Sequence, residues 1–166
     1  MISAIRHTGI VVTDMDRSLR FYHDLLQVGR VVCDHVVANP YIDRVTGLSN
    51  ARIRIVMLEA ADEGRVELLQ YLSHPREGRN DITSCDIGCS HVALQVENVD
   101  RLYQRLMAAG TWFHSPPQVD PNGYAKVAYC RDPDNAIVEL VQVLSDGNSP
   151  YLSTSQSADL DQWPKQ

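Results

Sequence analysis

The amino-acid sequence predicts an α+β protein made of two tandem copies of one βαβββ module. Two motifs recur in the same order in each half of the chain, which is the signature of an internal structural repeat. Residues 66–73 read VELLQYLS and residues 138–145 read VELVQVLS, with six of eight positions identical. His7 and His91 are each followed, nine and ten residues later, by an Asp-Arg pair. Two independent motifs in the same order are difficult to attribute to chance.

Hydrophobic periodicity assigns the same elements to both halves. Strand-length apolar or alternating segments are followed in each half by a helix with one apolar face. Turn residues at 62–64 and 132–135 predict hairpins between the last two strands of each half. The His-to-Glu spacing is 60 residues in the first half and 48 in the second, so the first half holds about a dozen extra residues. The predicted strands are residues 4–12, 30–37, 52–59 and 65–73, then 90–97, 112–114, 124–131 and 136–144.

Each predicted helix has a capping residue at its start and a glycine beyond its end. Thr13 or Asp14 can cap the first helix and Asn98 can cap the second, while Gly29 and Gly110 follow them. The side chains expected to face the core are Leu19, Tyr22, Leu26, Leu102, Leu106 and Ala109. We expect one compact domain overall, with a first module (1–73), a linker (74–89), a second module (90–145) and a loosely ordered tail (146–166).

Composition and charge argue against several functional classes. The chain has 166 residues, of which 44% are hydrophobic and 22% charged, as in ordinary globular proteins. Its net charge of −6, with both signs interspersed, gives no basic surface for nucleic acid or anionic lipid. The N-terminal residues lack the layout of a signal peptide, and no apolar run reaches the roughly 20 residues that span a bilayer. We therefore expect a cytoplasmic protein that binds neither nucleic acid nor membrane, with its four cysteines as free thiols.

The repeated His and Glu residues form a candidate metal site. Because side chains alternate along a strand, Glu67 points away from Val66 and Leu68, which face the helix-covered core. Two carboxylates on an apolar strand face would be costly without a compensating cation. Two imidazoles with two carboxylates suit Zn, Ni, Co, Mn or Fe(II) and leave coordination positions open for water or substrate. The candidate ligands are His7, Glu67, His91 and Glu139.

Each of these residues has a simpler interpretation when it is taken alone. A single His on a strand is commonly a hydrogen-bonded structural residue, and a single Glu in Val-Glu-Leu is commonly solvated. Their recurrence at equivalent positions would require four separate coincidences, so the repeat favours the metal site. A pseudo-twofold axis between the halves would bring all four side chains into one cleft.

Three segments resemble the glyoxalase I and methylmalonyl-CoA epimerase group of the vicinal oxygen chelate superfamily. They read IRHTGIVVTDMDRSLRFYHDLL, CSHVALQVENVDRL and YCRDPDNAIVEL, and the likeness covers residues 5–144. The resemblance implies paired βαβββ modules that form a half-open mixed β-barrel around a metal cleft. It also implies metal ligands at His7, Glu67, His91 and Glu139, and a homodimer, since members are commonly dimers.

Two positions depart from the glyoxalase I pattern. Val11 stands where that enzyme usually has an arginine that helps to hold glutathione, and Tyr71 stands where it usually has an asparagine. Both departures argue against glutathione as a substrate. The epimerases use a separate general base, for which Asp34, His35 and Asp43 lie in the corresponding region.

The open metal site predicts an enzyme that acts on a small substrate with two adjacent oxygens. Chelation would acidify the neighbouring C–H, and Glu139 or Glu67 would act as the base. The outcome would be a glyoxalase- or epimerase-type lyase or isomerase reaction. Two alternatives remain open, which are an Fe(II) ring-cleaving dioxygenase and a non-catalytic drug-binding or resistance protein. Specificity is expected to depend on the loop at 35–50 and on cleft residues such as Tyr71, Gln95, Tyr124 and Tyr129.

Overall fold

The structure of the chain, a computed structural model, describes residues 4–77, 82–88 and 91–144. The predicted tail at 146–166 and parts of the predicted linker lie outside the described residues. None of the helices in the described ranges is long and apolar enough to cross a membrane.

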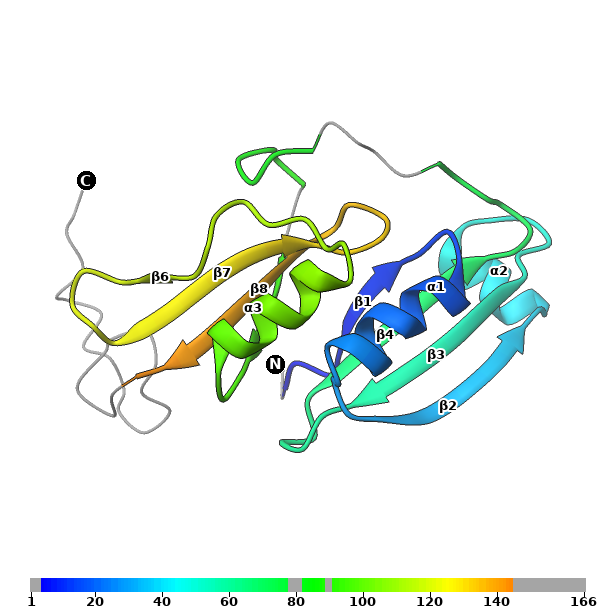
Figure 1. Cartoon of the computed structure of the whole chain (residues 1–166). Helices are drawn as coiled ribbons and strands as arrows, with labels where there is room; N and C mark the ends of the chain where they lie inside the picture. The colour runs from blue at the N-terminus through cyan, green and yellow to red at the C-terminus, as the bar shows by residue number, and fades with distance from the viewer. Residues whose placement is uncertain (1–3, 78–81, 89–90, 145–166) are drawn as a thin grey trace, which may run out of the picture.

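Two four-stranded sheets of the same topology form the frame of the molecule (Figure 1). Their strand orders are β1-β4-β3-β2 and β5-β8-β7-β6. In each sheet the first and last strands pair in parallel, as β1 with β4 and β5 with β8, and the other pairs are antiparallel. The predicted pair of βαβββ modules is therefore confirmed, as half-open sheets rather than a closed barrel. The strands are β1 (Thr8–Val11), β2 (Arg30–Val37), β3 (Ile53–Glu59), β4 (Arg65–Tyr71), β5 (His91–Gln95), β6 (Gln118–Val119), β7 (Ala125–Arg131) and β8 (Ile137–Val143).

One helix crosses each sheet. In the first module α1 (Met15–Leu19) continues into a π-helical segment, η1 (Arg20–Leu25), and in the second module α3 (Val99–Ala108) takes the same place. Asp14 caps α1 through the N–H of Arg17, and Asn98 caps α3 in the same way, so the predicted caps are found. Of the side chains expected to face the core, Ala109 is instead exposed at the end of α3.

The repeated Gln of each Val-Glu-Leu-x-Gln motif holds the start of its helix. The side-chain oxygen of Gln70 accepts the N–H of Met15 at 3.4 Å, and that of Gln142 accepts the N–H of Val99 at 2.9 Å. These are N–H groups of a first helical turn, which have no partner within the helix. The motif thus fixes the helix relative to the last strand of its own module.

The extra residues of the first module form a short helix between β2 and β3. This helix, α2 (Pro40–Thr46), occupies the middle of residues 35–50, for which the sequence predicts a loop. Its signals are local, because Asn39 caps its start, Pro40 opens its first turn, and Gly47 ends it with a φ of 70°. In the second module the strand equivalent to β2 is the two-residue β6, and the strand predicted at 112–114 is reduced to an isolated bridge between Phe113 and Cys130.

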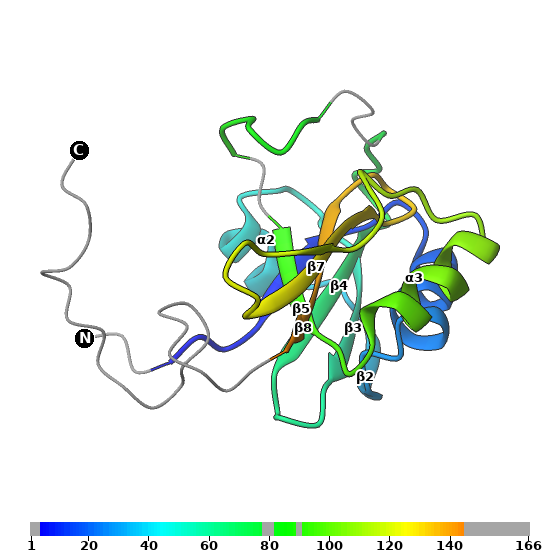
Figure 2. The same ribbon diagram turned by 60° about the vertical axis from the view of Figure 1, so that its left-hand side comes forward.

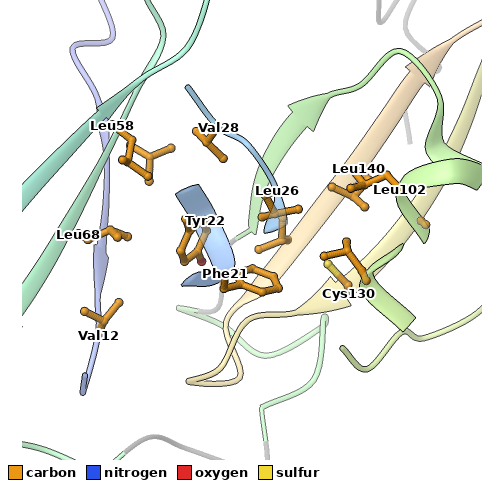
Figure 3. Packing of buried hydrophobic residues seen from close by; sticks show 14 of the residues in the cluster. Val12, Phe21, Tyr22, Leu26, Val28, Leu58, Leu68, Leu102, Cys130 and Leu140 are labelled. Atoms are coloured by element: carbon orange, nitrogen blue, oxygen red, sulfur yellow. The ribbon is translucent and has the colours of Figure 1, made fainter. Parts of the chain in front are cut away.

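A single hydrophobic core joins the two modules. Figures 1 and 2 show α1 and α3 side by side, and the core cluster contains buried side chains from both helices and both sheets. In Figure 3, Phe21 and Leu26 of the first module lie toward Cys130, Leu102 and Leu140 of the second. The helix-covered faces of both sheets are consequently closed to solvent, which leaves the opposite faces for the site.

Candidate metal centre

The first His–Glu pair lies on the open face of the first sheet. Glu67 is on β4 between the buried Val66 and Leu68, so it points away from the core, and it pairs in register with Gly9 of β1. His7 directly precedes β1, and its Nε2 lies 3.3 Å from Oε2 of Glu67. The Glu67 side chain is only 18% exposed.

The second pair repeats this arrangement. Glu139 of β8 pairs in register with Ala93 of β5 and lies between the buried Val138 and Leu140. Nε2 of His91 lies 3.0 Å from Oε2 of Glu139, whose side chain is again 18% exposed. Repeat-equivalent strand positions therefore produce the same imidazole–carboxylate contact twice.

Tyr129 distinguishes the second pair from the first. It is the cross-strand neighbour of Glu139 on β7, so its phenol ring lies on the same open face as that carboxylate. Its ring also lies 5.4 Å from the His91 ring. Burial, and then the negative charge of Glu139, raise the pKa of Tyr129 above its usual value, which keeps the hydroxyl protonated as a donor.

The structure does not bring the two pairs together within one chain. No three His, Cys, Asp or Glu side chains of the described residues are grouped closely enough to hold a metal ion. The single cleft expected to unite His7, Glu67, His91 and Glu139 is thus replaced by two separate half-sites. Strand alternation correctly gave the face of each side chain, but it carries no information about the distance between two modules that pack through their helices.

The donor atoms of each half-site fit a divalent metal. Imidazole nitrogen and carboxylate oxygen are ligands that borderline divalent ions accept. Over the described ranges, neither Glu67 nor Glu139 has a lysine or arginine within ion-pair distance, and the histidines are their ion-pair partners. A cation bound at both pairs would supply the charge that these two half-buried carboxylates lack.

The three candidates for a separate general base, Asp34, His35 and Asp43, have different surroundings in the structure. Asp34 binds Arg54 through both carboxylate oxygens, at 3.0 and 2.8 Å, and this contact lowers the pKa of Asp34. Asp43 accepts the N–H groups of Asn50 and Ala51, so it closes the turn after α2. Structural roles therefore occupy both carboxylates, while His35 is an exposed residue of β2.

Most of the residues expected to determine substrate specificity lie on the same open sheet faces as the His–Glu pairs. Tyr71 and Gln95 share the parity of Glu67 and His91 on their strands, so they lie on the open faces with Tyr129. Tyr124 precedes β7, where its carbonyl accepts the N–H of Leu144.

The sequence profile of the Glyoxalase/Bleomycin resistance protein/Dioxygenase superfamily matches residues 4–140. The chain belongs to this superfamily. The resemblance to vicinal oxygen chelate proteins is thereby confirmed over nearly all of the described residues. No curated protein is significantly similar to the chain in sequence.

Solved structures of superfamily members share the fold at low identity. A glyoxalase family protein from Bacillus cereus has a TM-score of 0.77 and 22% identity, over 87% of this chain and 97% of that one. The trypanothione-dependent glyoxalase I of Leishmania major has a TM-score of 0.61 and 23% identity, over 85% of this chain and 87% of that one. A mutant of the fosfomycin resistance protein FosX from Listeria monocytogenes was solved with Mn(II) and a dihydroxypropylphosphonic acid. It has a TM-score of 0.59 and 18% identity, over 84% of this chain and 90% of that one.

Proposed function

We propose that the chain is a metal-dependent lyase or isomerase of the vicinal oxygen chelate type. The observation that carries this proposal is the repeated contact between an imidazole and a mostly buried carboxylate at equivalent positions of both modules. Membership of the superfamily supports it, because metal-dependent enzymes such as glyoxalase I and FosX have the same fold. The proposed substrate is a small molecule with two adjacent oxygen atoms, and the proposed reaction moves a proton on the carbon beside a carbonyl.

Two imidazoles and two carboxylates would hold the metal. When bound, Zn, Ni, Co, Mn or Fe(II) supplies Lewis acidity, which makes the C–H beside a carbonyl more acidic. The proposed ligands are His7, Glu67, His91 and Glu139.

Glu67 and Glu139 are the proposed proton carriers. A carboxylate within reach of the substrate carbon can accept its proton and return it at a neighbouring carbon. Glu139 has His91 and the polar Tyr129 as neighbours, whereas the cross-strand neighbour of Glu67 is Met57, which has no hydroxyl group to offer. Glu67 is the less restrained of the two, so we assign it the larger part in proton transfer.

A second copy of the chain would complete the site. The open faces that carry the two pairs also carry apolar side chains, among them Val11, which is 60% exposed. Because one chain keeps its half-sites apart, we propose that the His7–Glu67 pair of one copy meets the His91–Glu139 pair of another. A dimer of this kind would hold two metal sites and would cover both open faces.

Mixed dimers test the site and the reaction together. One variant carries His7→Ala with Glu67→Ala, the other carries His91→Ala with Glu139→Ala, and differently tagged copies are co-expressed and purified as the mixed species. Each variant alone should bind no metal, while the mixed dimer regains one site with all four ligands. We expect one metal per mixed dimer, against two for wild type, measured by elemental analysis. The His74→Ala and His114→Ala variants serve as controls that keep full metal.

The same mixed dimer should catalyse metal-dependent exchange of deuterium from D₂O into a substrate panel. The panel contains 2-oxo acids, hydroxyketones and 2-carboxyacyl thioesters. A mixed dimer that binds no metal would show that each site is formed within one chain. A variant that keeps a full equivalent of metal would show that its substituted residues are not ligands. Bound iron with oxygen-dependent consumption of a catechol would replace the proposed reaction by ring cleavage.

A further inference from the structure

A hollow of about 650 Å³ lies between the two modules, on the helix side of the molecule. The first module contributes residues of α1 and η1, and the second contributes the end of α3 and the turn between β7 and β8. Its size falls within the range of sites that bind small molecules. None of the four proposed metal ligands lines it, and Glu67 and Glu139 point to the opposite faces of their sheets.

Three arginines line this hollow, and their charges are only partly compensated. Arg17 pairs with Asp134 at 2.5 Å, but its Nε is buried without a hydrogen-bond partner among the described residues. Arg131 is 9% exposed, and among the described residues its guanidinium donates to two backbone carbonyls, those of Ile82 and Asn135. Arg20 is exposed, and its guanidinium makes no hydrogen bond or ion pair with any residue in the part of the chain that the structure describes.

The one carboxylate of the lining is committed elsewhere. Asp132 is 5% exposed and accepts three hydrogen bonds, from the hydroxyl of Tyr22 at 2.9 Å and from the N–H groups of Asp134 and Ala136 at 2.9 and 2.7 Å. Both of its oxygens are therefore occupied by donors that belong to the fold. Because these donors are neutral, Asp132 keeps its charge; with Asp134 it offsets two of the three guanidinium charges, and one positive charge remains for an anion to balance.

Apart from Thr111 and Asn135, the rest of the lining is apolar, and two aromatic rings form part of it. Phe21, which lies between Tyr22 and Cys130 in Figure 3, forms part of one wall. Trp112 forms part of the other and is 56% exposed, and the guanidinium of Arg131 lies 6.0 Å from the centre of its ring. An exposed tryptophan beside arginines suits a ligand that joins a flat apolar body to a negative charge.

We propose that this hollow is a second binding site, for a small aromatic anion whose carboxylate or phosphate group is held by Arg17, Arg20 and Arg131. The aromatic body would lie against Trp112 and Phe21. Since the lining comes from both modules, a bound anion would stabilise their arrangement, and the unfolding temperature would rise with ligand concentration. The site is separate from the metal centre, so its occupancy does not depend on the proposed catalytic function.

Calorimetric titration with phenyl phosphate and with benzoate, at about 0.15 M salt, tests this site. Benzyl alcohol serves as the uncharged analogue. Arg20→Gln is the main variant, because Arg20 has no partner to lose and Gln104 stands at the equivalent position of the second module. We expect Arg20→Gln and Trp112→Leu each to weaken anion binding about tenfold, since a hydrogen bond to a charged group or a stacking contact is lost. Arg101→Gln, an exposed arginine on α3 outside the hollow, should leave the affinity within about twofold.

Three results of the titrations with wild type and the arginine variants would overturn the proposal. These are no binding by either anion, equal binding by benzyl alcohol, and an affinity that responds no more to Arg20→Gln than to Arg101→Gln. The Glu67→Ala/Glu139→Ala variant separates the two sites, because it should lose metal and still bind the anion. Loss of anion binding in that variant would assign the anion to the metal centre and would also overturn the proposal.

Discussion

The two modules place their His–Glu pairs with the same frame but surround the carboxylates differently. In both, an aspartate of the first helical turn pairs with a basic residue of the third strand, as Asp16 with Arg54 and Asp100 with Lys126. Next to the carboxylates the modules diverge. Gly9 and Met57 flank Glu67 in the sheet, whereas Ala93 and Tyr129 flank Glu139. Both His–Glu pairs thus share one arrangement of helix and strands. The residues beside Glu67 and Glu139 differ, and they give the two carboxylates different surroundings.

The contact between the modules is one-sided as well. Tyr22 of η1 donates to the buried Asp132 of the second module. At the positions equivalent to these two, the chain has Leu106 and Ala60, which cannot form the same bond. An internal repeat therefore does not imply a symmetric interface. The buried Tyr22–Asp132 bond has no counterpart, and it stands beside more exposed polar contacts between the modules, such as Arg17 with Asp134.

Removal of this contact should have the largest effect. Asp132→Ala leaves the Tyr22 hydroxyl and two backbone N–H groups buried without their acceptor, and each such group costs about 1–3 kcal/mol. We expect a loss of about 3–5 kcal/mol in the free energy of unfolding, measured by denaturant titration. Asp100→Ala, which breaks an exposed ion pair with Lys126, should cost less than about 1 kcal/mol. Equal losses in the two variants would show that the interface does not depend on the buried acceptor.

The flanking residues should produce an intermediate effect, on metal binding rather than on folding. Tyr129→Phe removes the hydroxyl of the residue beside Glu139 but keeps the ring beside His91. Loss of a polar group that supports a metal-binding residue commonly weakens a metal site about 10–100-fold. We expect the affinity for Zn or Co to fall at least about tenfold in competition with a chelator, while Met57→Leu leaves it nearly unchanged. An unchanged affinity in Tyr129→Phe would mean that the two carboxylates are equally restrained.

Much of the fold was predictable from the sequence because the repeat supplies each element twice. The helix caps, the two hairpins and the face of each candidate ligand follow from local signals, since alternation and capping act over a few residues. Two local predictions were incomplete for identifiable reasons. The segment at 35–50 was treated as a loop although Asn39, Pro40 and Gly47 mark a helix, and the strand expected at 112–114 is too short to pair beyond one bridge.

The arrangement of the two half-sites was not predictable in the same way. Which module face packs on which depends on side chains far apart in sequence, such as Phe21 against Cys130 and Tyr22 with Asp132. These residues carry no periodic signal that distinguishes an intermodule contact from an ordinary core contact. The spacing of apolar residues also does not predict the π-helical turn that carries Phe21 and Tyr22. The sequence thus predicted the members of the candidate site but not their separation in one chain.

The smallest effect is expected where the modules differ by one methyl group. Gly9 faces Glu67 as Ala93 faces Glu139, and an added Cβ at Gly9 would lie 3.8 Å from Oε2 of Glu67 and 3.4 Å from Cδ1 of Leu69, both ordinary contacts. Gly9→Ala should raise the free energy of unfolding by about 0.5 kcal/mol, because alanine restricts the unfolded chain, and should leave metal affinity within about twofold.

Gly29→Ala is the matched control for Gly9→Ala, because its Cβ would lie 2.0 Å from the carbonyl oxygen of Glu59 at a φ of +116°, so this variant should be strongly destabilised. Denaturant titration gives the free energy of unfolding of both variants, and chelator competition gives their metal affinity. If Gly9→Ala instead loses metal while it stays folded, the open space beside Glu67 is a requirement of the first half-site. The two carboxylates would then differ in the space around them as well as in their neighbouring side chains. That result would support the assignment of Glu67 as the more mobile one.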